Sequence, residues 1–319
     1  MRLRWTAAAL ALAACGGGDE TPSAPGWTAL ASMPIGLGEI AVASDGSNIY
    51  VTGGYNTQRT FQIYDVAMDR WQIGDSLLVG TDNAGAIFAD RQLVVFGGEG
   101  TPYVQIFDTI TQVWSLAPSL PSPRFSSVTE LVGGQVHLVG GWSFDRSNNV
   151  SLASHDVFDL GGRAYAPGAH APLATARNHA FSGVIDGKIY VTGGRSPGHE
   201  GDDGQNVASS EVYDPGADAW SPFADLPTPR SVGAAAVVGG KLYVLGGQLP
   251  GNTLYKTIER FDPSTGAWAR LADMPVYAAG QRAVAVGGDI YMFGGFARSG
   301  DQRTSTAGVA DVWRYTPPP

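Results

Sequence analysis

The stretch Ile189-Tyr190-Val191-Thr192-Gly193-Gly194 decides the fold, because close variants of it recur along the whole chain. Each copy is four mostly aliphatic, β-branched or aromatic residues followed by a glycine pair. This composition predicts a short buried strand whose end lies against another backbone. The second glycines fall at positions 54, 98, 141, 194, 247 and 295, at steps of 43 to 53 residues. Strand-like units repeated at this period indicate a β-propeller with one blade per copy.

Each copy sits in a constant setting that predicts the rest of a blade. A turn such as Asp186-Gly187 or Gly239-Gly240 precedes it, following a strand of small residues. Downstream, an aromatic residue is followed seven positions later by Trp or Tyr in five units: Tyr64 to Trp71, Phe107 to Trp114, Phe158 to Tyr165, Tyr213 to Trp220 and Phe261 to Trp268. A constant interval fixes the register of a hairpin. We therefore expect four antiparallel strands per blade, a to d.

The two ends of the chain complement each other. Tyr315 is the aromatic residue of the third strand in the sixth unit, and its partner seven residues later would fall beyond Pro319, so the outer strand of this unit is missing. Trp27–Pro34 is an unpaired counterpart of Trp268–Pro275. Because an open sheet edge favours aggregation, we expect the N-terminal strand to complete the last blade. The sequence thus predicts an all-β, six-bladed propeller closed by its N-terminal strand.

These features together resemble the Kelch repeat, from Trp27 to about Pro317. The resemblance rests on the glycine pairs, on Tyr/Phe-Asp-Pro turns such as Asp214-Pro215, and on the spaced Trp residues. It implies the propeller fold. Tyr165 in place of Trp is a local departure from the pattern.

The N-terminal residues are expected to be processed rather than folded. Met1–Ala14 begins with a basic segment and continues as an apolar run, typical of a signal peptide. Leu12-Ala13-Ala14-Cys15-Gly16 resembles a bacterial lipobox, which implies lipid on Cys15; the alternative is an ordinary secretory leader. Residues 15–26 are expected to form a flexible tether and residues 27–319 the propeller. This predicts an exported bacterial lipoprotein, in the outer membrane or at the cell surface.

The charge balance limits the classes of partner. The net charge is −9 and no basic stripe is present, which argues against nucleic acid. Contact with a membrane is expected only through the lipid on Cys15. No motif for a cofactor or a metal is found; the acidic segment 199–204 has carboxylates enough for calcium but matches no calcium-loop pattern.

Topology predicts one functional face. In a four-stranded meander the d–a and b–c connections leave the same side of the disc. The longest b–c connections belong to blades three, four and six. The d–a connections contain four arginines: Arg124, Arg177, Arg230 and Arg282. Guanidinium groups favour carboxylate or phosphate ligands, so these arginines are candidate binding residues. The alternative is that each arginine bonds carbonyls of a neighbouring blade.

The residues that follow the glycine pairs are further candidates for ligand binding. Tyr55, Trp142 and Phe296 could stack on a sugar ring, and Arg195 occupies the same position in blade four. Ordinary loop packing is the alternative. Asn178 and His179 follow Arg177, yet nothing links them to a nucleophile at a diagnostic spacing.

Two classes of function remain open on the sequence. The first is a binding module that presents this face to a glycan, peptide or protein; a role in envelope assembly, in which loops of several blades contact a larger protein, is a separate possibility. The second is an enzyme acting on a sugar acid, similar to N-acetylneuraminate epimerase, a mutarotase, which also has Kelch repeats. No motif specific to that enzyme is found, so a binding module is the preferred hypothesis, with no cofactor.

Overall fold

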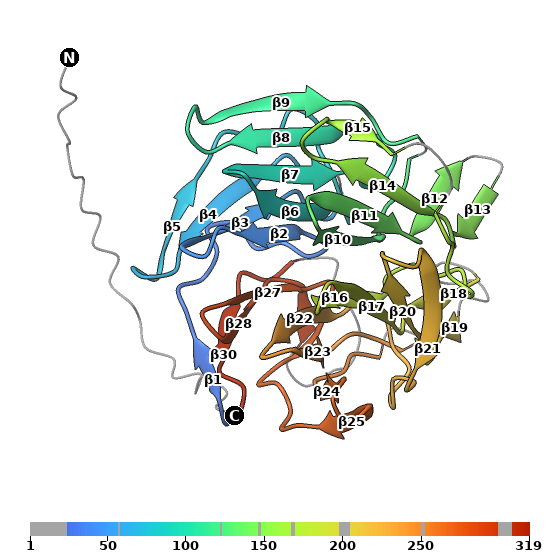
Figure 1. Cartoon of the computed structure of the whole chain (residues 1–319). Helices are drawn as coiled ribbons and strands as arrows, with labels where there is room; N and C mark the ends of the chain where they lie inside the picture. The colour runs from blue at the N-terminus through green and yellow to red at the C-terminus, as the bar shows by residue number, and fades with distance from the viewer. Residues whose placement is uncertain are drawn as a thin grey trace, which may run out of the picture.

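The computed structural model describes residues 24–56, 58–121, 123–145, 148–166, 170–197, 205–249, 253–298 and 308–319. Six four-stranded antiparallel sheets stand in a ring around a central channel (Figure 1). The predicted signal peptide, Cys15 and most of the tether lie outside the described residues. Within the described part, no helix is long and apolar enough to cross a bilayer.

The blades follow one another along the chain, each with its innermost strand first. Blade 1 is β2 (Ala41–Ser44), β3 (Asn48–Thr52), β4 (Phe61–Asp65) and β5 (Arg70–Ile73). Blade 2 is β6 (Gly85–Ala89), β7 (Gln92–Phe96), β8 (Val104–Asp108) and β9 (Val113–Ala117). Blade 3 is β10 (Val128–Val132), β11 (Gln135–Val139), β14 (His155–Asp159) and β15 (Ala164–Tyr165).

The second half repeats the arrangement and then closes it. Blade 4 is β16 (Phe181–Ile185), β17 (Lys188–Thr192), β20 (Ser210–Asp214) and β21 (Ala219–Phe223). Blade 5 is β22 (Ala234–Val238), β23 (Lys241–Leu245), β24 (Ile258–Asp262) and β25 (Ala267–Arg270). Blade 6 is β27 (Arg282–Val286), β28 (Asp289–Phe293), β30 (Val312–Tyr315) and the N-terminal β1 (Trp27–Ala29).

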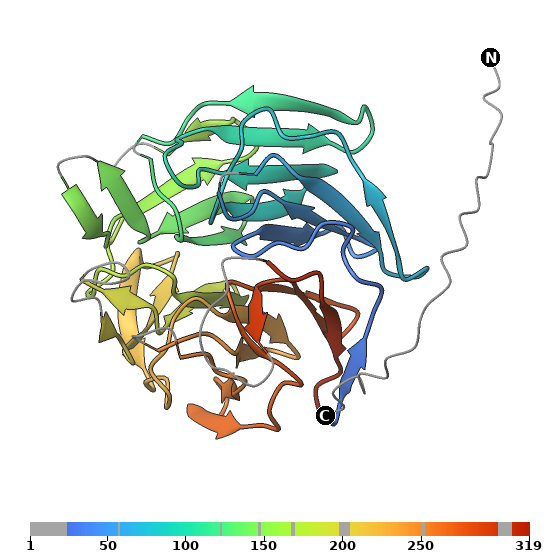
Figure 2. The same ribbon diagram turned by 180° about the vertical axis from the view of Figure 1, so that it is seen from behind.

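The predicted closure is confirmed. Strand β1 pairs antiparallel with β30, and Figure 2 shows the blue N-terminal strand beside the red C-terminal one. In this pairing Trp27 lies opposite Tyr315. The two rings stack with their centroids 4.8 Å apart. The N-terminal strand therefore supplies the outer edge of blade 6, and the ring contains six blades.

The aromatic pairs lie as their spacing predicts and also join the blades. Tyr213, for example, is directly opposite Trp220, and the four other predicted pairs hold the same register. Four of the tryptophans donate their indole N–H to a carbonyl of the preceding connection: Trp71 to Ala31, Trp114 to Asp75, Trp220 to Ala171 and Trp268 to Ala224. The repeated Trp thus stabilises the sheet and the contact between neighbouring sheets.

The glycine pairs are required by backbone conformation and by close contact. Both glycines of every pair have positive φ, from 57° to 132°. The second glycine donates its N–H to a carbonyl of the following blade, as from Gly194 to Arg230 at 3.0 Å. The other five pairs make the equivalent bond, to Thr81, Arg124, Arg177, Ala278 and Leu37. Each blade is thereby tied to the next by main-chain atoms.

Substituting one glycine of a pair should cost more than substituting a turn glycine of the same conformation. Gly193 has φ +63°, and an added Cβ would lie 2.8 Å from the Arg230 carbonyl oxygen. Gly239 has φ +58° with no atom within 4 Å of such a Cβ. We expect Gly239→Ala to cost about 1 kcal/mol and Gly193→Ala about 3 kcal/mol or more in urea unfolding. Equal losses of stability in the two variants would show that the close approach of Gly193 to the Arg230 carbonyl adds nothing to the cost of substitution.

A closed ring of main-chain hydrogen bonds surrounds one end of the channel. Each blade contributes one residue with φ between 50° and 69°, and its N–H donates to the carbonyl of the equivalent residue one blade earlier. The six donor–acceptor distances are 2.6 to 3.3 Å. These residues, here called the central ring, are Glu39, Asn83, Ser126, His179, Val232 and Gly280.

Candidate functional site

The d–a and b–c connections meet on one face, as the strand topology predicts. The residue beside each of four central-ring positions pairs as in an antiparallel β-sheet with the residue after a glycine pair: Phe125 with Trp142, Asn178 with Arg195, Ser231 with Gln248 and Ala279 with Phe296. Three small two-stranded sheets extend blades 3, 4 and 6 here: β12 (Trp142–Asp145) with β13 (Asn148–Ser151), β18 (Arg195–Ser196) with β19 (Gln205–Asn206), and β26 (Tyr277–Ala279) with β29 (Phe296–Arg298). We call this side the loop face.

Three of the four candidate arginines lie inside blades, in ion pairs. Arg124, Arg177 and Arg230 are at most 3% exposed. They pair with Asp156, Glu211 and Glu259, each on the third strand of the same blade. Burial lowers the pKa of all three guanidinium groups, against the opposing effect of their carboxylate partners.

The hydrogen bonds of Arg177 are an example of how these buried guanidinium groups are held. Its guanidinium donates to the carbonyls of Gly193 at 3.1 Å and Ser209 at 2.6 Å, and to Glu211 at 2.7 Å. All three acceptors belong to blade 4, the arginine's own blade. The alternative weighed from the sequence had placed such carbonyls in a neighbouring blade. The arginine therefore joins the second and third strands of one sheet.

Arg282 is placed differently from the other three. It opens the innermost strand of blade 6 and lies two residues after the central ring, whereas the buried arginines lie two residues before it. Its guanidinium donates to the Gln281 carbonyl at 3.2 Å and to Asn83 Oδ1 at 3.1 Å. Burial lowers its pKa, while the charges of Glu39 and Asp82 raise it. Of the four arginines, it alone lines the channel cavity described below.

The candidates that follow the glycine pairs are brought together only in part. Tyr55 and Phe296 meet edge to face, with ring centroids 5.6 Å apart. Trp142 is 2% exposed and packs against Phe125 instead, and Arg195 is 4% exposed and donates to Ser231 Oγ. Tyr55 is half-buried. Whether any of these residues binds a ligand stays a prediction.

Carboxylates gather at the mouth of the channel on blades 1 and 2. Asp82 is 1% exposed, hydrogen-bonds to Glu39, and accepts the Asn56 N–H at 3.1 Å. Burial raises the pKa of Asp82 to about 6; the bond to Glu39 lowers it, and the charge of Glu99 raises it. The neighbouring Glu99 is exposed. This part of the loop face is therefore acidic, with Arg282 as the cation below it.

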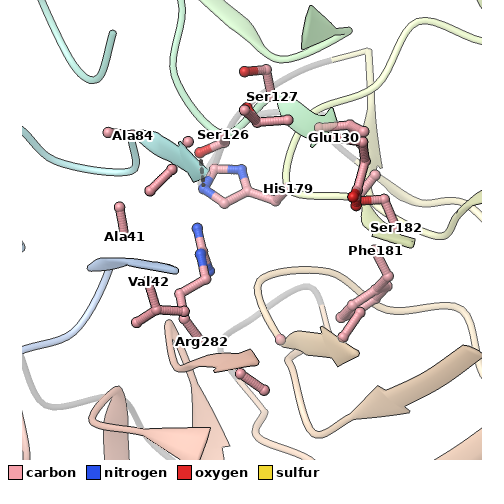
Figure 3. A pocket seen from close by; sticks show the side chains of 18 of the residues that line it. Ala41, Val42, Ala84, Ser126, Ser127, Glu130, His179, Phe181, Ser182 and Arg282 are labelled. Carbon is pink, nitrogen blue, oxygen red and sulfur yellow. Dashed lines mark hydrogen bonds between the residues drawn. The ribbon is translucent and has the colours of Figure 1, made fainter. Parts of the chain in front are cut away.

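A cavity of about 160 Å³ occupies the channel beneath the central ring (Figure 3). Small residues of the innermost strands form most of its wall, among them Ala41, Ala84, Ala86, Ala235 and Ala283. The polar groups on its wall come from blades 3, 4 and 6: Ser126, Ser127, Thr129, Glu130, His179, Ser182 and Arg282. The cavity exists because the crowded inner strands carry alanine and glycine.

Glu130 is held in the cavity with one hydroxyl partner. Ser182 Oγ donates to its carboxyl at 2.7 Å. Burial raises the pKa of Glu130 to about 7, and the Ser182 bond only partly opposes this. The ionised form is therefore disfavoured in the folded protein.

Stability should consequently fall as pH rises between about 4.5 and 7. In that window the unfolded Glu130 loses its proton while the folded one keeps it, so the folded state binds more protons. Glu130→Gln should leave stability unchanged at pH 4.5 and raise it by about 1–2 kcal/mol at pH 8, after discounting for screening. Ser182→Ala removes the bond that favours the charged form, so it should raise the folded pKa of Glu130 and extend the loss of stability to higher pH. Urea unfolding across this range tests both; a gain from Glu130→Gln that is independent of pH would contradict the assignment.

The structure adds a partner for Asn178 and His179 that their sequence spacing did not reveal. His179 Nε2 lies 2.8 Å from Ser126 Oγ, and Nδ1 bonds Asn178 Oδ1. Ser126 precedes His179 by 53 residues, one blade earlier on the central ring. The signal in the sequence is the repeat itself, because both residues occupy the same position in consecutive blades.

Two other buried histidines, His137 and His155, do not line the cavity. His155 Nδ1 bonds the Ala171 carbonyl at 3.2 Å, and its Nε2 lies 2.9 Å from His137 Nδ1. Burial lowers the pKa of both histidines to about 4. Among the described residues, no three His, Cys, Asp or Glu side chains are placed to hold a metal ion. The acidic segment 199–204 is outside the described part.

Comparison with known proteins agrees with this architecture. The family model for the Kelch motif matches residues 176–227 and 229–275. The solved structure of YjhT superposes with a TM-score of 0.75, covering 89% of this chain and 96% of YjhT at 15% sequence identity. That likeness concerns the fold alone.

Similar sequences carry the same repeat. The Kelch-like protein terF of Aspergillus terreus is 28% identical over 258 residues, which are 73% of this chain and 54% of terF. Alpha-scruin of Limulus polyphemus is 26% identical over 239 residues, 69% of this chain and 26% of that protein. The chain therefore spans about a quarter to a half of these relatives.

The molecule is a six-bladed β-propeller whose connections build a single loop face. The glycine pairs, the aromatic register, the family match and the relatives make it a Kelch-repeat β-propeller.

Proposed function

We propose that this protein is a binding module that takes a basic segment of a protein or peptide at the channel mouth of its loop face. The observation that carries the proposal is the acidic group at that mouth. Asp82 hydrogen-bonds to Glu39 there, the charge of Glu99 acts on Asp82, and Arg282 is a cation that influences Asp82. A lysine or arginine side chain from a partner would offset the repulsion between Asp82 and Glu99.

The surroundings of these carboxylates suit a peptide. Tyr55 follows the glycine pair of blade 1, the position that Glu99 occupies in blade 2. The exposed Tyr103 lies four residues after Glu99, in the same b–c connection. Aromatic and charged groups on irregular loops, held by a rigid scaffold, are typical of recognition surfaces. The Kelch-like relatives are consistent with a role in protein interaction.

A peptide array with matched lysine-rich, acidic and neutral members tests the proposal. We expect the lysine-rich members to bind and Glu99→Lys to weaken them about tenfold, with affinity falling as salt rises. Thr111→Lys, which adds a lysine on a turn at the opposite end of blade 2, should have little effect. Because ionised Asp82 attracts the cation, affinity should rise as pH increases through about 6. Binding of neutral glycans with no response to salt would refute this assignment.

The sugar-acid alternative gains no support from the described residues. Three of the four arginines that it would use for a carboxylate are engaged in buried ion pairs. We therefore retain the binding module as the single proposed function.

Lipid attachment at Cys15 is proposed with it. The support is the lipobox-like segment from Leu12 to Gly16. Metabolic labelling with a fatty-acid analogue in a bacterial host should mark the full chain and not its Cys15→Ser variant. Equal labelling of both would exclude this site.

A further inference from the structure

Ser126, His179 and Asn178 form a directed chain of hydrogen bonds at the top of the cavity. Ser126 Oγ lies 2.8 Å from His179 Nε2, and His179 Nδ1 bonds Asn178 Oδ1. The order is hydroxyl, imidazole and then a group that orients the imidazole. Nucleophilic serine catalysis requires this order.

The partners of Asn178 determine which histidine nitrogen carries the proton. Asn178 Nδ2 donates to Ser151 Oγ at 2.8 Å, and the Ser151 hydroxyl donates to the Arg195 carbonyl at 3.4 Å. The atom that Asn178 turns toward His179 is therefore its oxygen, which can only accept. His179 thus holds its proton on Nδ1, and Nε2 is left to accept the proton of Ser126. This is the tautomer that a general base needs.

The cavity provides space for a small acyl group beside Ser126. Ser126 and His179 both border it, and alanines form part of its wall (Figure 3). Its volume of about 160 Å³ is close to that of engineered cavities that hold benzene. An acyl group up to about the size of benzoyl would fit.

Arg282 offers positive charge in the same space. Its guanidinium extends from β27 into the cavity bordered by the His179 ring (Figure 3). It donates to the Gln281 carbonyl and to Asn83 Oδ1, and a guanidinium has five N–H donors in all. A preorganised cation of this kind stabilises the negative oxygen that forms when a carbonyl is attacked.

We propose that Ser126 is an activated nucleophile that hydrolyses small esters in the central cavity. Its oxygen bonds to the ester carbonyl carbon while its proton passes to His179 Nε2, and the carbonyl oxygen takes negative charge toward Arg282. The carbon–oxygen bond to the alcohol then breaks, and the alcohol leaves with the proton from Nε2. Water attacks the acyl-serine in the same way, releasing the carboxylic acid and restoring Ser126. Asn178 is a positioning residue in this scheme.

The experiment uses the whole chain with a small aryl acetate and a small sulfonyl fluoride. We expect a burst of phenol release, and sulfonylation within residues 125–146, the tryptic peptide that begins after Arg124. Tandem mass spectrometry should place the label on Ser126. Because this mapping needs no variant, it holds even if a substitution impairs folding. No label on this peptide, or a label on Ser127 alone, would overturn the proposal.

Variants then separate chemistry from structure. Ser126→Gly suits the local φ of 52° and removes the hydroxyl, so it should abolish the burst and the label. Ser264→Ala, on an exposed turn of blade 5 that does not line the cavity, should keep both. Asn178→Asp should raise the acylation rate, on the order of tenfold or more, because a carboxylate stabilises the imidazolium better than an amide does. A lower rate for that variant at an unchanged melting temperature would count against the role of His179 as the base.

Discussion

Arg230→Met is expected to destabilise the propeller by about 3–5 kcal/mol, the usual cost of leaving one member of a buried ion pair without its partner. Glu259 is 3% exposed and would remain in blade 5 without its cation. The carbonyls of Val244 and Gly246 would lose their donors as well. Urea unfolding of the variant and the parent chain measures the difference.

Two further variants test the cause of that loss. Arg230→Met combined with Glu259→Gln should recover part of it, because no buried charge is then left unpaired. Arg270→Met removes a surface pair with Asp273 in the same blade and should cost less than about 1 kcal/mol. A loss below about 1 kcal/mol for Arg230→Met itself would show that the pair is dispensable.

Removing residues 27–33 is the second change with a large expected effect. The deletion takes away β1, the stacking of Trp27 on Tyr315, and Met33, which is 3% exposed. It also removes Ala31, whose carbonyl accepts the indole N–H of Trp71 in blade 1. We expect a loss of at least about 5 kcal/mol and association through the open edge of β30.

Removal of residues 16–21 is the matched control and should change neither stability nor association state. Unfolding midpoints and sedimentation velocity report the two effects separately. If both deletions gave the same midpoint and a monomer, the N-terminal strand would not be what closes the ring.

The blades and their closure could be predicted because they depend on repeated local signals. The interval from Tyr213 to Trp220 recurs in five blades, and only one hairpin register satisfies it. The likeness of Trp27–Pro34 to Trp268–Pro275 then identified the missing strand. Both signals are short-range, so no knowledge of the tertiary contacts was needed.

The partners of the arginines were not predicted, although the sequence contains a signal for them. Asp156, Glu211 and Glu259 each stand two residues before the aromatic of the third strand, in the three blades that have the buried arginine. Blades 1 and 2 have Gln62 and Gln105 at that position and no arginine. Comparing the repeats with one another would have indicated the ion pairs before the structure was known.

The contact between Ser126 and His179 depends on the central ring, whose positions are not marked by any particular residue type. Central-ring positions carry Glu, Asn, Ser, His, Val and Gly, so no motif marks them. What these residues share is a positive φ and a place in the circle of backbone bonds. Such a property follows from closure of the whole ring and cannot be read from one blade.

Because the central ring is made entirely by main-chain atoms, the chemistry displayed at the channel entrance is independent of what holds the entrance open. Five of the six ring residues carry different side chains around the same aperture, whereas a Cβ added at Gly280 would lie 2.8 Å from Phe296. The same backbone can therefore present charged, neutral or reactive side chains at the channel entrance.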